Sequence, residues 1–420
     1  MNQRRKFIKN SLIGGISLMA VPSCKTLGFG GQGPGNYDLT RDVAAQYFDG
    51  EMCYVHPRGG IVPHQGVGQM PEIAMTMTTL DLAGSDVFKG MYGLHTQDLG
   101  KTWSPVEKQE MMSPRFETID GVRRPVAASD FWPKYHHQSK QLLGIGHTVV
   151  YTPDWKVAHP RPRHTSYSMY DPKTHRWNKW KKLEMPDTNK FHNAGAGSVQ
   201  RYDLANGEII LPIYFMPPES NSKVTVLRCG YDGQTLTVLD QGNEMAVDDE
   251  TRGLHEPSVT FYEGNYYLVM RNDKTSYVTR SKDGLQYETY RRWTFDDGSD
   301  LGTYNTQQHW VTHSKGLFLV YTRRGADNDH VFRHRAPLFM AEVDPEKLCV
   351  IRETERILVP ERGARLGNFG VTDVSPDETW VTVSEWMQPA GVEKYGSNGS
   401  VWVARIQWNE TNDLFDVVRS

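Results

Sequence analysis

Short runs in which apolar and polar residues alternate cover most of this chain after its first 24 residues. Residues 207–215 and 261–270 are two examples, and Gly, Asp, Asn and Pro separate such runs from one another. Alternation with a period of two residues is typical of strands with one buried face, and helical periodicity is scarce here. The pattern therefore predicts an all-β protein made of strands and tight hairpins.

Two segments share a hairpin pattern that is more specific than alternation alone. Residues 96–103 read TQDLGKTW, and residues 281–287 read SKDGLQY, which is one residue shorter. In such an Asp box, the Asp side chain accepts hydrogen bonds from N–H groups of the turn, Gly adopts a positive φ, and the aromatic residue packs on the outer edge. Weaker versions of the same strand–turn unit occupy residues 167–180, 227–236, 338–345 and 401–408.

Together these segments make six units at a spacing of about 60 residues, which is typical of repeat architectures. A radial array of four-stranded blades needs one unit per blade, so the spacing predicts a six-bladed β-propeller in a single domain over residues 41–420. A β-sandwich with fortuitous hairpins is the alternative. The last strand, near residues 401–408, is expected to close the ring with the start of the mature chain.

The first 24 residues have the order of parts of an export signal. Arg4 and Arg5 form a twin-arginine pattern, and an apolar run follows from residue 11 to residue 21. That run is too short to span a bilayer, and small residues come after it, as in a signal peptide. A surface helix with a basic end is the alternative. We expect a signal peptide over residues 1–24 and a mature N-terminal segment over 25–40.

Cys24 ends a sequence that resembles a lipoprotein cleavage box, although Pro22 is unusual there. Lipid attachment at Cys24 therefore stays open beside simple cleavage. No later stretch is apolar enough to cross a membrane. The sequence thus predicts a protein exported by the twin-arginine route, either periplasmic or tethered by a lipid at the cell envelope.

Composition narrows the partners and the chemistry. The 47 Lys and Arg residues nearly balance the 50 Asp and Glu residues, the net charge is −3, and no nucleic-acid partner is expected. After Cys24 only Cys53, Cys229 and Cys349 remain, and this odd, scattered set argues against a disulfide framework and against a cysteine zinc site. The histidines show no HExxH or other tight ligand spacing, so we expect no metal and no cofactor, and a structural metal inside the propeller is the alternative.

Three widely spaced arginines lie in strand-like settings beside turn signals. They are Arg58, Arg271 and Arg335. Guanidinium groups that converge on one point form a rigid, always-charged fork for a carboxylate. A propeller gathers residues from all its blades around its axis, so these three are expected to hold an acidic small molecule. Three structural arginines, each paired with a surface acid, are the alternative.

At this point the chain is similar to the sialidase (neuraminidase) superfamily over nearly its whole mature length. The Asp boxes and the order of the arginines carry this resemblance: Arg58 precedes the first box, Arg271 follows Glu256 by 15 residues, and Arg335 opens a later strand. The resemblance implies that the three arginines bind a sugar carboxylate. It also implies that Glu256 acts as a base or nucleophile, although a capping or pairing role remains the alternative.

The resemblance implies two further roles for acids and exposes one difference. Glu385 occupies the place of the acid that orients the first arginine, and Asp81 that of the general acid, with Asp86 as its competitor. The family's tyrosine nucleophile is missing, because residues 365–373 contain no tyrosine. Tyr304, with His309 nearby in sequence, is a candidate replacement or a lyase-style acid and base.

Bulky polar residues concentrate in segments 302–310 and 323–334. Amide and imidazole groups suit sugar hydroxyls, and Trp and Tyr provide a stacking face, so Gln308 and Arg324 are candidate substrate-binding residues. We expect a monomeric exo-acting glycoside hydrolase that removes a terminal acidic sugar from a glycan. A polysaccharide lyase acting on a uronate-containing glycan and a non-catalytic carbohydrate-binding propeller are the alternatives.

Overall fold

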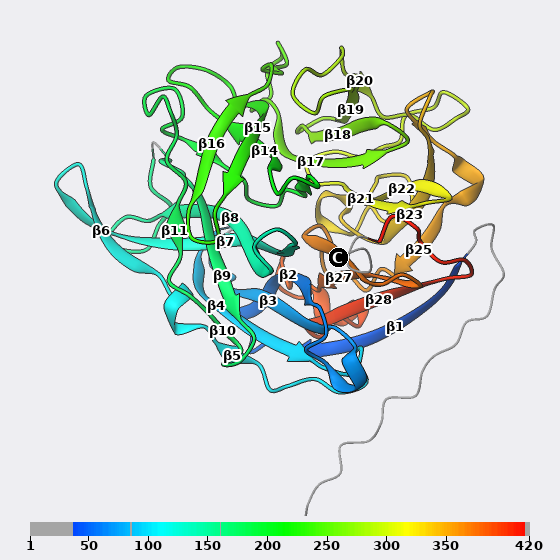
Figure 1. Ribbon diagram of the computed structural model, residues 1–420, viewed down its shortest axis with the longest axis horizontal. Coiled ribbons are helices and arrows are strands. Elements are labelled where there is room, and N and C mark those ends of the chain that lie inside the picture. Colours follow the sequence, from blue (N-terminus) through cyan, green and yellow to red (C-terminus); the bar gives the residue numbers. More distant parts are fainter. Residues whose placement is uncertain (1–36, 85, 160, 416–420) are drawn as a thin grey trace, which may run out of the picture.

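A computed structural model of the chain describes residues 37–84, 86–159 and 161–415. The expected signal peptide and Cys24 lie outside these residues. Six antiparallel sheets follow one another around a ring, and their colours run in sequence order around it in Figure 1. The prediction of an all-β, six-bladed propeller is confirmed.

The first three blades contain the following strands. Blade 1 consists of β2 (Met52–Val62), β3 (Glu72–Asp81), β4 (Phe88–Thr96) and β5 (Glu107–Lys108). Blade 2 consists of β6 (Arg115–Ile119), β7 (Val122–His136), β8 (Gln141–Val150), β9 (Thr165–Asp171), β10 (Arg176–Trp177) and β11 (Lys181–Lys182). Blade 3 consists of β12 (Ala194–Gly195), β13 (Tyr202–Asp203), β14 (Ile209–Phe215), β15 (Lys223–Tyr231) and β16 (Leu236–Gln241).

The last three blades complete the ring. Blade 4 consists of β17 (His255–Tyr262), β18 (Asn265–Arg271), β19 (Ser276–Ser281) and β20 (Arg291–Arg292). Blade 5 consists of β21 (His309–His313), β22 (Gly316–Tyr321), β23 (Leu338–Asp344), β24 (Cys349–Val350) and β25 (Arg356–Val359). Blade 6 consists of β26 (Phe369–Ser375), β27 (Glu378–Ser384), β28 (Ser400–Trp408) and β1 (Tyr37–Gln46).

Helical structure in the described residues is limited to single turns. These 3₁₀ turns are η1 (Val67–Gln69), η2 (Glu110–Met112), η3 (Phe332–His334), η4 (Arg352–Thr354) and η5 (Val392–Tyr395). Across the part of the chain that the structure describes, no helix has the length and apolar character needed to cross a membrane.

The ring is closed by strands from the two ends of the chain, as the sequence predicts. Strand β1 pairs antiparallel with β28, from Tyr37 opposite Trp408 to Gln46 opposite Ser400. Residues 37–40, which the sequence predicts to be part of the mature N-terminal segment, therefore belong to the sheet. Closure in this way covers the edge of β28, which would otherwise present unpaired backbone groups.

The Asp-box turns form as expected. Asp283 Oδ1 accepts hydrogen bonds from the backbone N–H groups of Leu285 (2.9 Å) and Gln286 (2.8 Å), and Gly284 has a φ of 77°. Asp98 accepts in the same way from Thr102 at 2.9 Å. The turns that join β9 to β10, β15 to β16 and β23 to β24 use the same device, with acceptors Asp171, Asp232 and Asp344.

Apolar side chains fill the space between neighbouring blades. Leu143 and Ile145 of blade 2, for example, pack with Leu211 and Ile213 of blade 3 in one buried cluster. Full burial of such a side chain stabilises the fold by about 1.5–3 kcal/mol. These layers hold the blades at fixed angles and so fix where the inner strands deliver their side chains.

The middle of the propeller axis is closed by four residues from four blades. The guanidinium of Arg58 lies 5.4 Å from the centre of the Trp132 ring, and its Nε donates to the carbonyl of Phe369 at 3.3 Å. The His309 ring lies between Trp132 and Phe369, with ring centres 4.6 Å and 4.9 Å away. This axial plug separates a cavity at one end of the ring from a cavity at the other.

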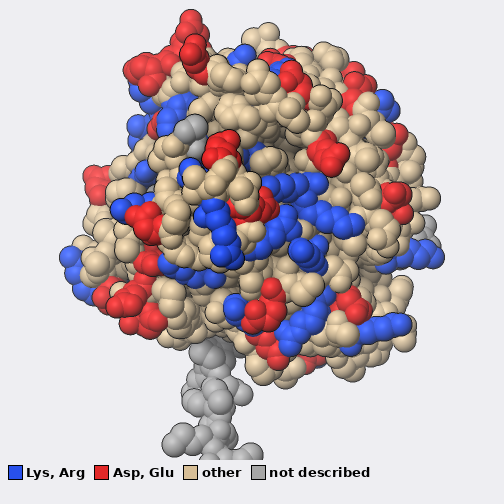
Figure 2. Space-filling view, turned by 90° about the vertical axis from the view of Figure 1, so that its left-hand side faces the viewer, with Lys and Arg blue, Asp and Glu red and all other residues tan. Residues whose placement is uncertain are grey.

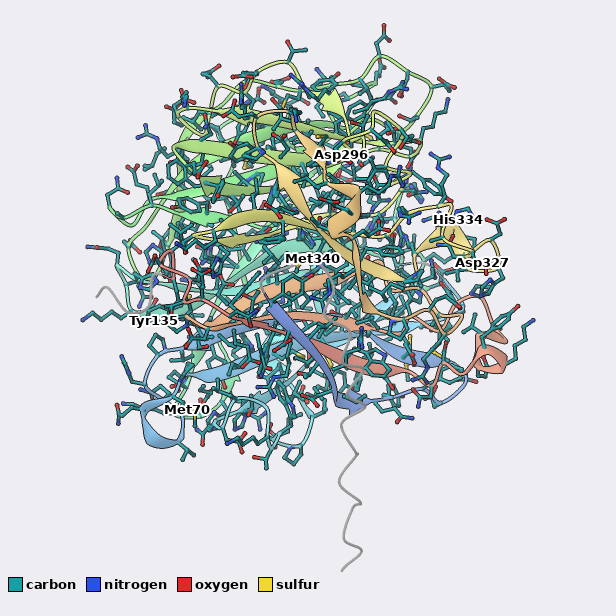
Figure 3. All side chains as sticks on the ribbon, turned by 90° about the vertical axis from the view of Figure 1, so that its right-hand side faces the viewer. Met70, Tyr135, Asp296, Asp327, His334 and Met340 are labelled. Atoms are coloured by element: carbon teal, nitrogen blue, oxygen red, sulfur yellow. The ribbon has the colours of Figure 1, made fainter. Side chains whose placement is uncertain are left out.

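The two ends of the ring lie on opposite sides of the molecule. Figure 3 shows Tyr135, which lines one cavity, far across the molecule from His334, whose neighbours Arg333 and Arg335 line the other.

Candidate functional site

The cavity on the Arg335 side of the plug is rich in arginine and has a volume of about 440 Å³. Its arginines are Arg161, Arg163, Arg252, Arg271, Arg333, Arg335 and Arg365. Its carboxylates are Asp86, Asp130 and Glu256. We call this cavity the arginine pocket. The excess of guanidinium over carboxylate gives the cavity a positive potential, which would favour an anionic ligand.

Three of these arginines form ion pairs. Arg161 Nη1 lies 3.1 Å from Asp86, and Arg271 Nη1 lies 2.5 Å from Glu256. Arg252 pairs with Asp273, which does not line the pocket. Within the described residues, the remaining four have no carboxylate at ion-pair distance: they are Arg163, Arg333, Arg335 and Arg365.

Asn305 holds three of the guanidinium groups together. Its side-chain oxygen accepts from Arg271 at 2.7 Å and from Arg252 at 3.3 Å, and its backbone carbonyl accepts from Arg335. Asn305 has a φ of 52°, a conformation that Asn tolerates better than most residues. A neutral acceptor thus positions Arg271 and Arg335 without neutralising Arg335.

Burial and mutual repulsion weaken the hold of two arginines on their protons. Burial, with repulsion from Arg271, Arg365 and Arg333, lowers the pKa of Arg335 well below its usual value. Burial, with repulsion from Arg333, lowers the pKa of Arg365 to about 9. An anion in the pocket would relieve this repulsion, so the charge distribution favours binding of one.

Bulges in the inner strands turn site residues toward the pocket. The strand registers shift between Val55 and Arg58 in β2, between Ser129 and Trp132 in β7, and between His255 and Ser258 in β17. The residues inside these bulges, which have positive φ, are His56 (57°), Asp130 (51°) and Glu256 (44°). All three line the pocket. Because bulges re-aim side chains, this repeated irregularity is a mark of a built site.

Asp130 binds four groups at the floor of the pocket. Ser198 donates to Oδ1 at 2.5 Å, while His56 Nε2 lies 3.2 Å and Arg58 Nη1 3.5 Å from the same oxygen. His147 Nε2 lies 3.3 Å from Oδ2. Burial alone would raise the pKa of Asp130, but His56, His147 and Arg58 hold it well below its usual value. Asp130 is therefore a fixed negative charge.

Tyr214 extends this network into the cavity. Its hydroxyl lies 3.0 Å from His147 Nδ1, and the Arg163 guanidinium lies 4.6 Å from the centre of its ring. Burial raises the pKa of Tyr214 and lowers the pKa of His147, so both are neutral at pH 7. The chain Tyr214–His147–Asp130 has a protic oxygen, a base and an orienting carboxylate in series. No motif in the sequence singled out Tyr214 or His147.

Three of the sequence-predicted residues meet in the pocket. Arg271, Arg335 and Glu256 all line it. Arg58 does not: it is 0% exposed and lies beneath the pocket, where Ser198 and Asp130 bind its guanidinium. The expected direct contact between Arg58 and a ligand is therefore not supported by its position, because the middle of β2 faces the plug.

The predicted acids are placed differently from expectation. Glu385 accepts from the backbone N–H groups of Asn398 and Ser400 and pairs with Arg362 at 3.2 Å, so the expected contact with Arg58 is not formed. Asp130 takes that position instead.

Of the two competing aspartates, only Asp86 reaches the pocket. Asp81 ends β3 and pairs with Lys89 at 3.5 Å, and it does not line the cavity. Asp86 lies five residues further along, in the loop before β4, where Arg161 holds it beside the opening. Of the two, the aspartate in the loop lines the pocket and the aspartate at the strand end does not.

Four further candidates lie outside the pocket lining. Tyr304 bonds His334 at 2.6 Å, and Arg324 stacks on its ring at 4.8 Å. Gln308 is buried and donates to the Thr306 carbonyl at 2.7 Å. His309 is fully buried in the plug, so Tyr304 and His309 do not form a pair.

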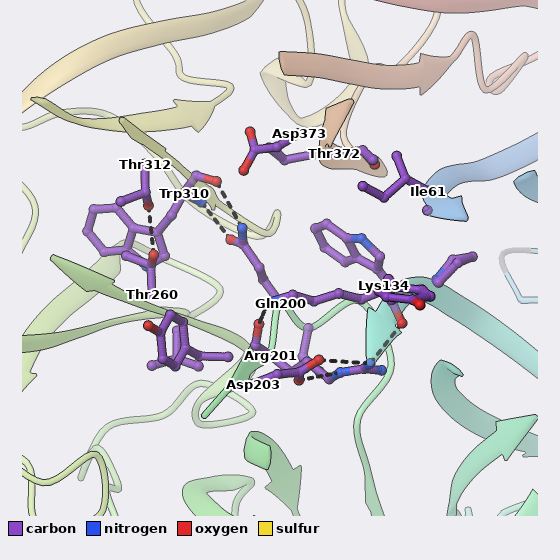
Figure 4. A pocket seen from close by; sticks show the side chains of 18 of the residues that line it. Ile61, Lys134, Gln200, Arg201, Asp203, Thr260, Trp310, Thr312, Thr372 and Asp373 are labelled. Carbon is purple, nitrogen blue, oxygen red and sulfur yellow. Dashed lines mark hydrogen bonds and ion pairs between the residues drawn. The ribbon is translucent and has the colours of Figure 1, made fainter. Parts of the chain in front are cut away.

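The cavity at the other end of the axis, of about 210 Å³, has the opposite character (Figure 4). The side-chain amide of Gln200 exchanges two hydrogen bonds with the backbone of Trp310, at 2.9 Å and 2.8 Å. Arg201 pairs with Asp203 at 2.9 Å. These polar groups of the second cavity are thus paired with one another. In the arginine pocket, by contrast, four guanidinium groups have no carboxylate partner among the described residues.

Basic side chains also gather on the outer flank that carries β6 and β11, with acidic ones around them (Figure 2). There Arg115 and Lys182 both pair with Glu117, at 2.9 Å and 2.5 Å. These basic side chains on the flank are therefore neutralised by a neighbouring surface acid, unlike the unpaired arginines of the arginine pocket.

No family model matches the chain, and no curated protein matches it. Among solved structures, a Dyadobacter fermentans protein of unknown function is similar, with a TM-score of 0.58 and 13% identity over 88% of this chain and 98% of that one. The NanB sialidase from Streptococcus pneumoniae has a TM-score of 0.58 and 10% identity, over 86% of this chain and 70% of that one.

Trypanosoma rangeli sialidase in complex with the inhibitor DANA has a TM-score of 0.53 and 13% identity, over 84% of this chain. The match spans 55% of that sialidase, about half its length. The fold is therefore a sialidase-like propeller. At these identities the likeness concerns the fold alone.

Proposed function

We propose that this protein is an exo-acting glycoside hydrolase that removes a terminal acidic sugar from a glycan. One observation carries the proposal: unpaired guanidinium groups and the Tyr214–His147–Asp130 chain line the same pocket. The guanidinium groups supply recognition of a carboxylate, and the chain supplies a nucleophile with its base. Export to the cell envelope would place the enzyme where glycans are found.

The sugar carboxylate binds to Arg271 and Arg335, whose positions Asn305 sets. A carboxylate accepts charge-assisted hydrogen bonds from both, which are stronger than bonds between neutral groups. The axial plug gives the pocket a blind end, so a chain cannot thread through it. The terminal sugar of a glycan is therefore the unit that fits.

In the first step, Tyr214 Oη attacks the anomeric carbon as its proton passes to His147 Nδ1. Asp130 stabilises the imidazolium that forms. The bond between the anomeric carbon and the leaving oxygen breaks, and that oxygen takes up a proton from Asp86. The raised pKa of Tyr214 makes the adjacent base necessary, because the free phenol does not ionise at neutral pH.

In the second step, water attacks the anomeric carbon while the Asp86 carboxylate accepts its proton. The bond to Tyr214 breaks, and His147 returns the proton to the phenolate. Glu256 Oε1 pairs with Arg271, whereas Oε2 is buried without a hydrogen-bond partner among the described residues. That oxygen is available to accept from a sugar hydroxyl or to stabilise positive charge on the ring.

A polysaccharide lyase is the second candidate, and the position of Arg163 over Tyr214 favours it. A guanidinium near the ring stabilises a phenolate that removes the proton beside a uronate carboxylate. The C–O bond at the neighbouring carbon then breaks, a C=C bond forms, and the leaving oxygen takes up a proton.

A screen of acidic glycans with mass analysis of products tests the proposal. Hydrolysis gives products whose masses sum to that of the substrate plus one water. Elimination gives masses that sum to the substrate alone, and an ultraviolet absorbance from the conjugated double bond. Release of a terminal acidic sugar with water uptake supports the hydrolase. Elimination products, or binding of acidic glycans without any product, would overturn it in favour of a lyase or a binding propeller.

A further inference from the structure

The arginine pocket carries more positive charge than one carboxylate neutralises. Among the described residues, Arg163, Arg333, Arg335 and Arg365 line the pocket without an ion pair. A single sugar carboxylate brings one negative charge. Desolvated like charges repel one another, so a ligand with a second anion complements this pocket better than a ligand with one.

The unpaired guanidinium groups fall into distinct places. Arg335 belongs with Arg271 at Asn305. Arg333 and Arg365 instead flank the ring of Phe332, with guanidinium carbons 5.1 Å and 5.0 Å from its centre. We call Arg271 and Arg335 the carboxylate site, and Arg333 and Arg365 beside Phe332 the Phe332 site. The cavity therefore has two pairs of guanidinium groups.

The Phe332 site has the features of a place for a charged sugar substituent. Phe332 is 45% exposed although it is a large apolar side chain, so it offers a face on which a sugar ring can stack. Arg365 is 3% exposed, is fixed by Trp386 at 3.9 Å and by Gln388, and has a buried Nε without a hydrogen-bond partner among the described residues. A fixed fork with a free donor is preorganised for an anion.

We propose that the substrate carries two anionic groups, with the carboxylate of the terminal sugar at Arg271 and Arg335 and a second anion between Arg333 and Arg365. This inference rests on the proposed function, since it names the substrate class of the same pocket. The second anion is either a sulfate ester on the terminal sugar or the carboxylate of the next acidic sugar. Both present oxygens that a guanidinium fork binds.

Calorimetric titration of the Tyr214→Phe variant tests this inference, because that variant is expected to bind without turnover. Glucuronic acid and N-acetylneuraminic acid serve as monoanionic probes. Their O-sulfated forms and the disaccharides of two such units serve as dianionic probes. We expect at least one dianionic probe to bind about tenfold more tightly or better than its monoanionic parent. The sulfated and disaccharide arms identify the source of the second anion.

Two variants of the Phe332 site and one control complete the experiment. Arg333→Gln and Arg365→Gln should weaken binding of the dianionic probe more than binding of its monoanionic parent, and so remove the advantage of the dianionic probe. Arg324→Gln, whose guanidinium lies outside the pocket lining and 3.7 Å from Asp300, should keep the advantage. Arg333 is exposed, so its replacement tests the site even where loss of Arg365 impairs folding.

Equal affinity for monoanionic and dianionic probes, or an advantage that survives Arg333→Gln, would overturn the second anion site. Failure of the proposed function gives a different result, which is the absence of cleavage of any acidic glycan by the unmodified protein. The two failures are therefore separable.

Discussion

The hydroxyl of Tyr214 lies 3.0 Å from Nδ1 of His147, although the two residues come from different blades. The opposite ring nitrogen of His147 lies 3.3 Å from Asp130. In a neutral imidazole one nitrogen donates and the other accepts. A proton on Nε2, facing Asp130, leaves Nδ1 to accept the proton of Tyr214. The arrangement gives the buried phenol a path to lose its proton.

Replacement of Tyr214 by Phe should remove this path while conserving shape. We expect kcat to fall by at least about a hundredfold with KM little changed, because a positioned acid–base pair contributes about that much or more. Steady-state kinetics on an acidic glycan measure it. The matched control is Tyr135→Phe, which alters the cavity at the other end of the axis. Retained activity in Tyr214→Phe would exclude a catalytic role.

Asp86 and Asp81 differ by five positions and should differ in effect. Asp86→Asn should lower kcat by about a hundredfold, since the amide cannot protonate the leaving oxygen. Asp81→Asn should leave kcat unchanged, because it removes only a half-exposed pair with Lys89, worth about 0–1 kcal/mol. If kcat fell in Asp81→Asn and not in Asp86→Asn, Asp81 would be the general acid, as the family resemblance implies.

Arg271 should act in binding. Arg271→Ala removes one donor to the carboxylate and leaves Glu256 without its ion pair. We expect KM to rise by about tenfold or more, while circular dichroism shows a retained fold. Arg324→Ala provides the control outside the pocket. An unchanged affinity for the acidic ligand in Arg271→Ala would remove this arginine from the carboxylate site.

Asp130 should matter for stability as well as for activity. Arg58 is 0% exposed, and Asp130→Asn leaves that buried charge without a carboxylate. Loss of one partner of a buried ion pair costs about 3–5 kcal/mol. Urea unfolding should show this loss, whereas Ser198→Ala, which removes the hydrogen bonds of Ser198 to Arg58 and to Asp130, should cost less, about 1–3 kcal/mol. Equal stability of Asp130→Asn and the parent would show that Arg58 is satisfied by other groups.

Buried histidines should make the fold sensitive to acid. Burial lowers the pKa of His56 from 6.5 to about 4, and that of His309 well below its usual value. Between the pKa of a histidine in the unfolded chain and its lower pKa in the folded chain, the unfolded chain binds more protons. The free energy of unfolding therefore decreases as pH falls from about 6.5 toward 4. The slope is up to about 1.4 kcal/mol per pH unit for each such histidine.

Thermal unfolding from pH 7.5 down to pH 4 measures this dependence. His309→Gln removes one titrating group and should give a shallower decrease of Tm with falling pH than the parent. A parent Tm that is constant across this range would contradict neutral, buried histidines.

The sequence by itself determined the fold, because its signals act over short distances. The Asp98 and Asp283 turns bond only to backbone groups within a few residues, so their pattern is legible in the chain. The pairing of Arg271 with Glu256 is similarly local. His255 and Arg271 lie opposite one another in the β17–β18 hairpin, so residues 15 positions apart become neighbours.

Only the tertiary structure decided which side chains share the pocket. Tyr214, His147 and Asp130 come from three strands whose mutual positions depend on how blades 2 and 3 pack. A bulge in β7 aims Asp130, and a one-residue change of register would send it to the other face. Arg58 is buried because side chains from four blades form the axial plug around it. These relations arise from long-range packing, which leaves no spacing pattern in the chain.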